Sequence, residues 1–190
     1  MMLKLAWFVA STLALAVLLG QGSALSTAQP APWGALRQLE GDWKGSGKGE
    51  PGVSTSERNY SFILGAKFLH GRNRTVYEPQ EENSKGEVHQ NLDYFSYDRN
   101  RKKLVLRQFH GEGFVNQYVR TDSGADPKVF VFETEAIENI PAGWKAKETY
   151  RLLDNGEWLE TFELAAPGKE YEVYTETRLT KAQAAKGEMR

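Results

Sequence analysis

The sequence predicts an all-β domain: a single antiparallel up-and-down β-barrel of about ten strands, with a short N-terminal helix at one end. Three observations predict this fold. From Thr55 onward, segments rich in Val, Thr, Tyr, Phe and Trp alternate with turn residues at intervals of roughly ten to fifteen residues. The connections are short, so strands that are consecutive in sequence should pair as a meander. Closing these strands into a barrel removes exposed sheet edges.

The first 28 residues have the layout of a secretory signal peptide. Lys4 precedes an apolar core over residues 5–19, and small residues follow it. Cleavage is expected after Ala24 or after Ala28, both of which have a small residue at the −3 position. The apolar core is shorter than the ~20 residues that a membrane-spanning helix needs. We therefore expect an exported protein, periplasmic or secreted.

Composition narrows the classes of function. The chain has 24 Lys+Arg and 25 Asp+Glu, a formal net charge of −1, and therefore no basic field for nucleic-acid binding. The absence of cysteine excludes disulfides, thiolate catalysis and a lipid-modified N-terminal cysteine. We expect residues 29–180 to form the barrel and residues 181–190 a polar C-terminal tail. No transmembrane segment is expected in the mature chain, and the oligomeric state is left open.

The first expected element is a short helix over residues 32–39. Trp33, Leu36 and Leu39 fall on one face of it, and it is too short to be stable alone. It should therefore pack across one end of the barrel. The strands follow, with tight turns signalled by Asp154-Asn155-Gly156 and by residues 166–169. Their expected ranges are 43–47, 55–64, 67–77, 87–97, 103–109, 114–121, 128–134, 144–153, 157–164 and 170–180.

Several short motifs resemble those of the calycin group, which includes lipocalins, fatty-acid-binding proteins and nitrobindin-like barrels. The resemblance rests on the short helix before Gly41-Asp42-Trp43, on the glycines at 45, 47 and 49, and on Arg178 in the last strand. Residues 63–69 and 97–103 look like segments of bacterial exported lipocalin-like or nitrobindin-like proteins of unassigned function. The resemblance implies a structural closure in which Arg178 stacks on Trp43, a contact favoured by guanidinium–indole attraction.

Two segments suggest a ligand pocket. His70, Arg72 and Arg74 alternate with Leu69, Gly71 and Asn73, so one of these two faces points into the barrel. If the basic face points inward, an anionic headgroup would compensate its buried charge. If it points outward, the arginines are ordinary solvated wall residues.

The second segment covers residues 103–120, where both faces mix polar and apolar residues. Gln108 and His110 share a face with leucines, and Tyr118 lies on the next strand. This mixture is typical of a cavity with a few polar groups in an aromatic lining. The predicted ligand-binding residues are Arg72, Arg107, Gln108, His110, Tyr118 and Tyr150.

The leading hypothesis is a non-enzymatic exported barrel that binds a small apolar or amphipathic ligand, an anionic one included. No catalytic signature is present, so no catalytic or metal-binding residues are predicted. No cofactor is predicted, but the alternative is a nitrobindin-like haem barrel acting on reactive nitrogen species, with His110 or His70 as axial ligand. The axial histidine that the resemblance would place near the C-terminal strands is missing. A further alternative is a structural or partner-binding barrel with a filled interior.

Overall fold

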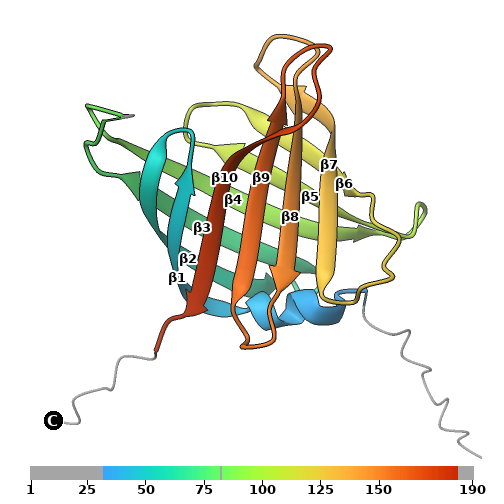
Figure 1. Ribbon diagram of the computed structural model, residues 1–190. Helices are drawn as coiled ribbons and strands as arrows, with labels where there is room; N and C mark the ends of the chain where they lie inside the picture. The colour runs from blue at the N-terminus through green and yellow to red at the C-terminus, as the bar shows by residue number, and fades with distance from the viewer. Residues whose placement is uncertain (1–31, 82, 184–190) are drawn as a thin grey trace, which may run out of the picture. The chain divides into compact units, whose positions relative to one another are not determined.

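The computed structural model describes residues 32–81 and 83–183, which form a closed barrel of ten antiparallel strands (Figure 1). Each strand pairs with its neighbour in sequence, and β1 closes the barrel on β10. The predicted signal peptide and most of the predicted tail lie outside the described residues. The strands are β1 (Gly41–Gly49), β2 (Gly52–Ile63), β3 (Phe68–Tyr77), β4 (Glu87–Asp98), β5 (Lys103–His110), β6 (Val115–Arg120), β7 (Val129–Glu138), β8 (Lys145–Leu152), β9 (Trp158–Ala165) and β10 (Glu172–Lys181).

A short helix, η1 (Gly34–Leu39), crosses the end of the barrel that lies at the bottom of Figure 1. It is a 3₁₀ helix, and Trp33, Leu36 and Leu39 are all buried. Their spacing of three matches the three residues per turn of a 3₁₀ helix, so all three side chains point the same way. The predicted helix therefore exists, in a tighter form than an α-helix. No helix among the described residues is long and apolar enough to cross a membrane.

The apolar core fills the half of the barrel next to η1. Phe95, Phe132 and Tyr150 meet edge to face, with ring centroids 5.6–6.1 Å apart, and Trp158 lies beside Phe130. All of these rings are at most 2% exposed. Aromatic rings at these separations contribute through both buried area and favourable ring geometry. The η1 end is therefore closed by packing.

The opposite end, which we call the mouth, is bounded by the β1–β2, β3–β4, β5–β6, β7–β8 and β9–β10 connections (Figure 1). Some inward-facing residues near the mouth are only partly buried, among them Thr134, Phe162 and Leu164, whereas Ser54 and Ala146 are buried. The interior thus changes from a closed apolar half near η1 to a half in which some side chains are partly exposed at the mouth.

Gly71 in β3 makes room for a large interior side chain. A Cβ atom built at Gly71 would lie 2.5 Å from Cε1 of Tyr60, which crosses over it from β2. We expect Gly71→Ala to lower the free energy of unfolding by about 1–3 kcal/mol, because the ring must move within a packed interior. Urea unfolding measures this loss, with Gly111→Ala as the control, since a Cβ there would meet its nearest atom at 3.3 Å. Equal losses in the two variants would contradict the close packing of Tyr60.

The closure around Trp43 differs from the expected one. The indole Nε1 of Trp43 donates a hydrogen bond to the Leu39 carbonyl oxygen at 2.6 Å. The cation over the indole ring is Lys181, whose Nζ lies 4.4 Å from the ring centroid. The expectation that Arg178 stacks on Trp43 is therefore wrong. Trp43 pairs with Lys181 in the β1–β10 register, whereas Arg178 points outward, where it forms an ion pair with Glu157 at 2.9 Å.

Candidate functional site

Four of the six predicted ligand-binding residues face the interior. Gln108, Tyr118 and Tyr150 are at most 3% exposed, and His110 is partly buried at the mouth end of β5. Their orientation follows from strand alternation, because Leu104 and Leu106 are buried at the same phase of β5 as Gln108. Whether these residues bind a ligand stays a prediction.

The other two predicted residues, Arg72 and Arg107, lie on the outer surface. The expectation that they line the interior is wrong. In β3 the buried residues are Leu69, Gly71, Asn73 and Tyr77, so the alternation of side chains places Arg72 outside. The expectation of an anionic headgroup depended on an inward-facing basic face that includes Arg72 and Arg74. Both residues are exposed, so this basis for an anionic ligand is lost.

Between the apolar core and the mouth lies a layer of buried ionisable and amide side chains, which we call the polar layer. It comes from strands on both sides of the barrel. The glycines at 45, 47 and 49 give β1 no inward side chain above Trp43, and side chains of the neighbouring strands, such as Ser54 and Thr177, pack close against them. The members of the polar layer are Arg58 of β2, Asn73 of β3, Asp93 of β4, Gln108 of β5, Glu148 and Tyr150 of β8, and Glu160 of β9.

Arg58 and Glu160 form an ion pair across the interior, from β2 to β9. Both side chains are 8% exposed. Burial by itself would lower the pKa of Arg58, but the charge of Glu160 raises it well above its ordinary value. The pair therefore places a guanidinium beside a carboxyl group inside the barrel, where each offsets the hydration that the other loses.

Asp93 is the best-satisfied carboxyl group in the polar layer. It accepts hydrogen bonds from the side-chain amides of Asn73 at 2.6 Å and Asn91 at 2.7 Å, and from the Tyr60 hydroxyl at 3.5 Å. Burial nevertheless dominates and raises the pKa of Asp93 to about 6, while the Asn73 hydrogen bond and the Arg58 charge oppose that rise. At neutral pH this carboxyl is therefore close to its titration range.

Glu148 is the least satisfied of the carboxyl groups that lack an ion-pair partner in the same layer. One carboxyl oxygen accepts a hydrogen bond from the Gln108 amide at 3.4 Å, and the other has no partner among the described residues. The Tyr150 hydroxyl, two residues further along β8, also lacks a partner in the part of the chain that the structure describes. Burial, followed by the charge of Glu160, raises the pKa of Glu148 well above its ordinary value. Two hydrogen-bonding groups thus face the interior with unused capacity.

His110 lies at the edge of the polar layer toward the mouth. Its ring stacks on Phe114 with centroids 4.0 Å apart, and its Nε2 lies 3.3 Å from the side-chain amide of Asn116. Asn116 in turn donates to the Tyr118 hydroxyl at 2.9 Å. Burial lowers the pKa of His110 to about 4, so the imidazole is neutral at physiological pH and can accept a hydrogen bond or coordinate a metal ion.

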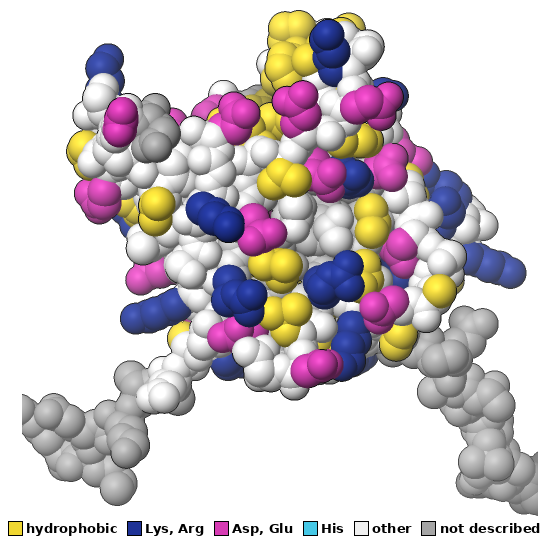
Figure 2. Space-filling view, viewed as in Figure 1, with side chains coloured by type: hydrophobic (Ala, Val, Ile, Leu, Met, Phe, Trp, Pro, Cys, Tyr) yellow, Lys and Arg dark blue, Asp and Glu magenta, His cyan; other side chains and the backbone are white. Residues whose placement is uncertain are grey.

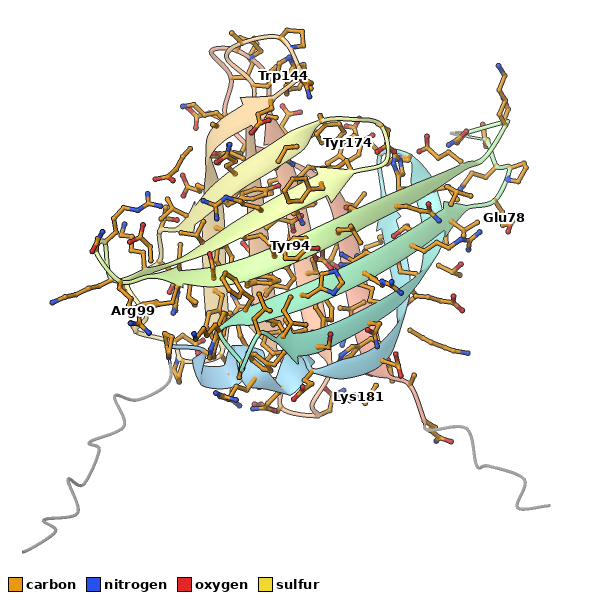
Figure 3. All side chains as sticks on the ribbon, turned by 180° about the vertical axis from the view of Figure 1, so that it is seen from behind. Glu78, Tyr94, Arg99, Trp144, Tyr174 and Lys181 are labelled. Carbon is orange, nitrogen blue, oxygen red and sulfur yellow. The ribbon has the colours of Figure 1, made fainter. Side chains whose placement is uncertain are left out.

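A groove of about 810 Å³ lies on the outer surface. It runs diagonally over β1–β5, where Asn59, Arg72, Leu92 and Phe109 follow one another in the strand register. Figure 3 shows this side of the barrel, with Tyr94 on the outside of β4. Its β1–β3 part carries exposed acidic and basic residues that face solvent, whereas the buried polar atoms that have no partner among the described residues face the interior. We therefore take the polar layer as the candidate site.

Sequence reasoning missed the ionisable members of the polar layer: Arg58, Asp93, Glu148 and Glu160. A signal was available for Asp93 and Glu148, because each lies at the same strand phase as an aromatic residue, Phe95 and Tyr150 respectively. Among the described residues, no group of three His, Asp or Glu side chains is arranged to hold a metal ion.

Comparisons with known proteins identify the fold and no family. No protein-family description matches the chain, and no curated protein matches it. Among solved structures, the chain is similar to the one titled "Crystal Structure of Rv2717c from M. tuberculosis", with a TM-score of 0.60 and 20% sequence identity. The match covers 82% of this chain and 99% of that one. A likeness at this level of identity shows that the two chains share the barrel fold.

Proposed function

We propose that this chain is an exported, non-enzymatic binding barrel that holds a small amphipathic ligand in its polar layer. The observation that carries the proposal is the set of buried hydrogen-bonding atoms that have no partner among the described residues, foremost Oε2 of Glu148 and the hydroxyl of Tyr150. Leaving such an atom unsatisfied costs about 1–3 kcal/mol, so several together favour a bound molecule that supplies the missing hydrogen bonds.

The amphipathic character follows from what a ligand would meet along its path. Phe162, Leu164 and Tyr174 are only partly buried at the mouth, and the rings of Phe162 and Tyr174 meet edge to face at 5.9 Å. An apolar body would pack against these side chains while a polar head reaches Glu148, the partner of Phe162 in the β8–β9 register, and Tyr150, which lies further from the mouth. This division into an apolar lining and a few polar groups is usual for small-molecule sites. Export is inferred from the sequence of the first 28 residues.

Native mass spectrometry of the mature protein, purified gently from the cells that naturally produce it, tests this proposal. We expect a fraction of the protein to carry a co-purifying small-molecule mass, and we expect Tyr150→Phe to reduce that fraction, because it deletes one of the unpartnered polar atoms. Arg107→Ala, on the outer surface, serves as the control. A protein that carries no added mass, and whose melting temperature does not change across a metabolite and lipid panel, would indicate a filled structural barrel instead.

A haem-binding barrel is the second candidate, and the position of His110 favours it. His110 faces inward near the mouth, and its neutral imidazole could supply one axial ligand to iron. An absorption spectrum of the same sample separates the two candidates. A Soret band that His110→Ala abolishes would establish haem binding, whereas a featureless visible spectrum together with a co-purifying mass would establish the first proposal.

A further inference from the structure

We propose that the ligand of the polar layer is an organic cation, such as an alkylammonium ion, and that Glu148 is its counter-ion. This inference rests on the proposed function, because it assumes that a ligand occupies the interior. It replaces the anionic headgroup that inward arginines would have suggested.

The balance of buried charge favours a cationic ligand. Among the described residues, the polar layer contains the three carboxyl groups of Asp93, Glu148 and Glu160 and one guanidinium, that of Arg58. Arg58 is paired with Glu160, and Asp93 receives its hydrogen bonds from amides and a phenol. Glu148 is left without a cation in the part of the chain that the structure describes. A buried carboxylate needs a counter-charge, and a ligand can supply it.

The unused hydrogen-bonding capacity around Glu148 favours a ligand that donates hydrogen bonds. Glu148 is 4% exposed and Tyr150 is 0% exposed, and the oxygen of each that has no partner among the described residues can accept a hydrogen bond. An ammonium group has three donors and no acceptor, so it can satisfy both oxygens at once. A carboxylate or phosphate would bring a second negative charge beside Glu148 and Glu160, which is unfavourable in a buried site.

The negative charge of the mouth also favours a cationic ligand. In the described connections that bound the mouth, glutamates outnumber lysines: Glu50, Glu78, Glu81, Glu112 and Glu170 against Lys85 and Lys169. Figure 2 shows acidic side chains near the upper rim of the molecule in that view. A negative rim raises the local concentration of cations and speeds their association, with an effect that falls as salt concentration rises.

Binding of a cation should release a proton. The charged and titratable groups that act on Glu148 come from several strands: Arg58 of β2, Asp93 of β4, Tyr118 of β6, Tyr150 of β8 and Glu160 of β9. Burial, Glu160 and Asp93 raise the pKa of Glu148, and Arg58 lowers it. Without ligand, burial therefore favours the protonated form of Glu148. When the ammonium ion binds, the carboxyl proton leaves to solvent and the carboxylate pairs with the ligand, so the net charge inside is unchanged.

Isothermal titration calorimetry with hexylammonium, hexanol and hexanoate tests the inference, because these probes share one chain and differ in their heads. We expect hexylammonium to bind at least about tenfold more tightly than the other two. Titrations at pH 7 in phosphate and in Tris, which differ in ionisation enthalpy, should show about one proton released per hexylammonium bound and none per hexanol.

Variants complete the test. Glu148→Gln preserves shape and removes the carboxylate, so it should abolish proton release and reduce the preference for hexylammonium over hexanol about tenfold or more. Arg107→Ala should retain both the proton release and the preference for hexylammonium. Circular dichroism checks that each variant is folded. If hexanol or hexanoate binds as tightly as hexylammonium, the cation inference is overturned while the binding barrel stands. If none of the three binds and the protein from its natural source carries no ligand, both proposals fail.

Discussion

Arg58→Met should destabilise the barrel by about 3–5 kcal/mol, a larger loss than we expect for Gly71→Ala or Arg178→Met. The substitution removes the cation that offsets the buried charge of Glu160, and both side chains are 8% exposed. An uncompensated carboxylate in the interior must then be protonated or hydrated, and either outcome costs stability. Urea unfolding at pH 7 measures the loss as a change in midpoint.

Arg178→Met is the matched control, because it breaks an Arg–Glu pair on the outer surface. Arg178 is 50% exposed in its pair with Glu157, so the loss there should stay below about 1 kcal/mol. A double variant that also replaces Glu160 with Leu should recover much of the loss caused by Arg58→Met, because no unpaired charge then remains. Equal losses for the two single arginine variants would contradict a buried ion pair.

Asp93→Asn should change how stability depends on pH. Burial raises the pKa of Asp93 from its ordinary 3.8 to about 6, so the folded state binds this proton more tightly than the unfolded state does. The stability that Asp93 contributes is therefore fully present below about pH 4 and is lost as the pH rises through 6. At about 1.4 kcal/mol per pKa unit, the wild type should lose about 3 kcal/mol relative to the variant between pH 3.5 and pH 7.

Asp154→Asn is the control for this experiment because its shift has the opposite sign. The hydrogen bond from Lys128 lowers the pKa of Asp154, which is exposed at the β8–β9 turn, so its contribution is present above the ordinary pKa and is lost as the pH falls. Unfolding free energies measured between pH 3.5 and pH 7 for the wild type and both variants give the pH-dependent stability that each aspartate contributes. If the unfolding free energies of the wild type and of Asp93→Asn change with pH in parallel, burial does not raise the pKa of Asp93.

The sequence allowed the fold to be predicted, because its signals are local. The turn at Asp154-Asn155-Gly156 fixed one hairpin, and spacing of three placed Trp33, Leu36 and Leu39 on one buried face. The predicted strand order needed only short connections, and the closed meander of ten strands confirms it. These features depend on neighbours in sequence, which a single chain displays directly.

The interior site could be predicted only in part. In β5 the apolar pair Leu104 and Leu106 sets the inward face, and Gln108 then follows from alternation. In β2 the inward residues of the mouth half are Ser54, Ser56 and Arg58, which look like an outer face in sequence. The partner of Arg58 is Glu160, seven strands later in the chain, and only closure of the barrel brings β2 opposite β9. Pairing across a barrel has no local signal.

The most direct test of the interior site is a high-resolution crystal structure of the protein purified from its natural source without exchange of ligand. If the polar layer binds a ligand, we expect continuous electron density there, within hydrogen-bond distance of Oε2 of Glu148 and the Tyr150 hydroxyl. This density should extend toward Phe162 and the mouth. Separate water molecules on the same atoms, with side chains filling the rest of the interior, would contradict a ligand-binding role and leave the barrel to act through its outer surface.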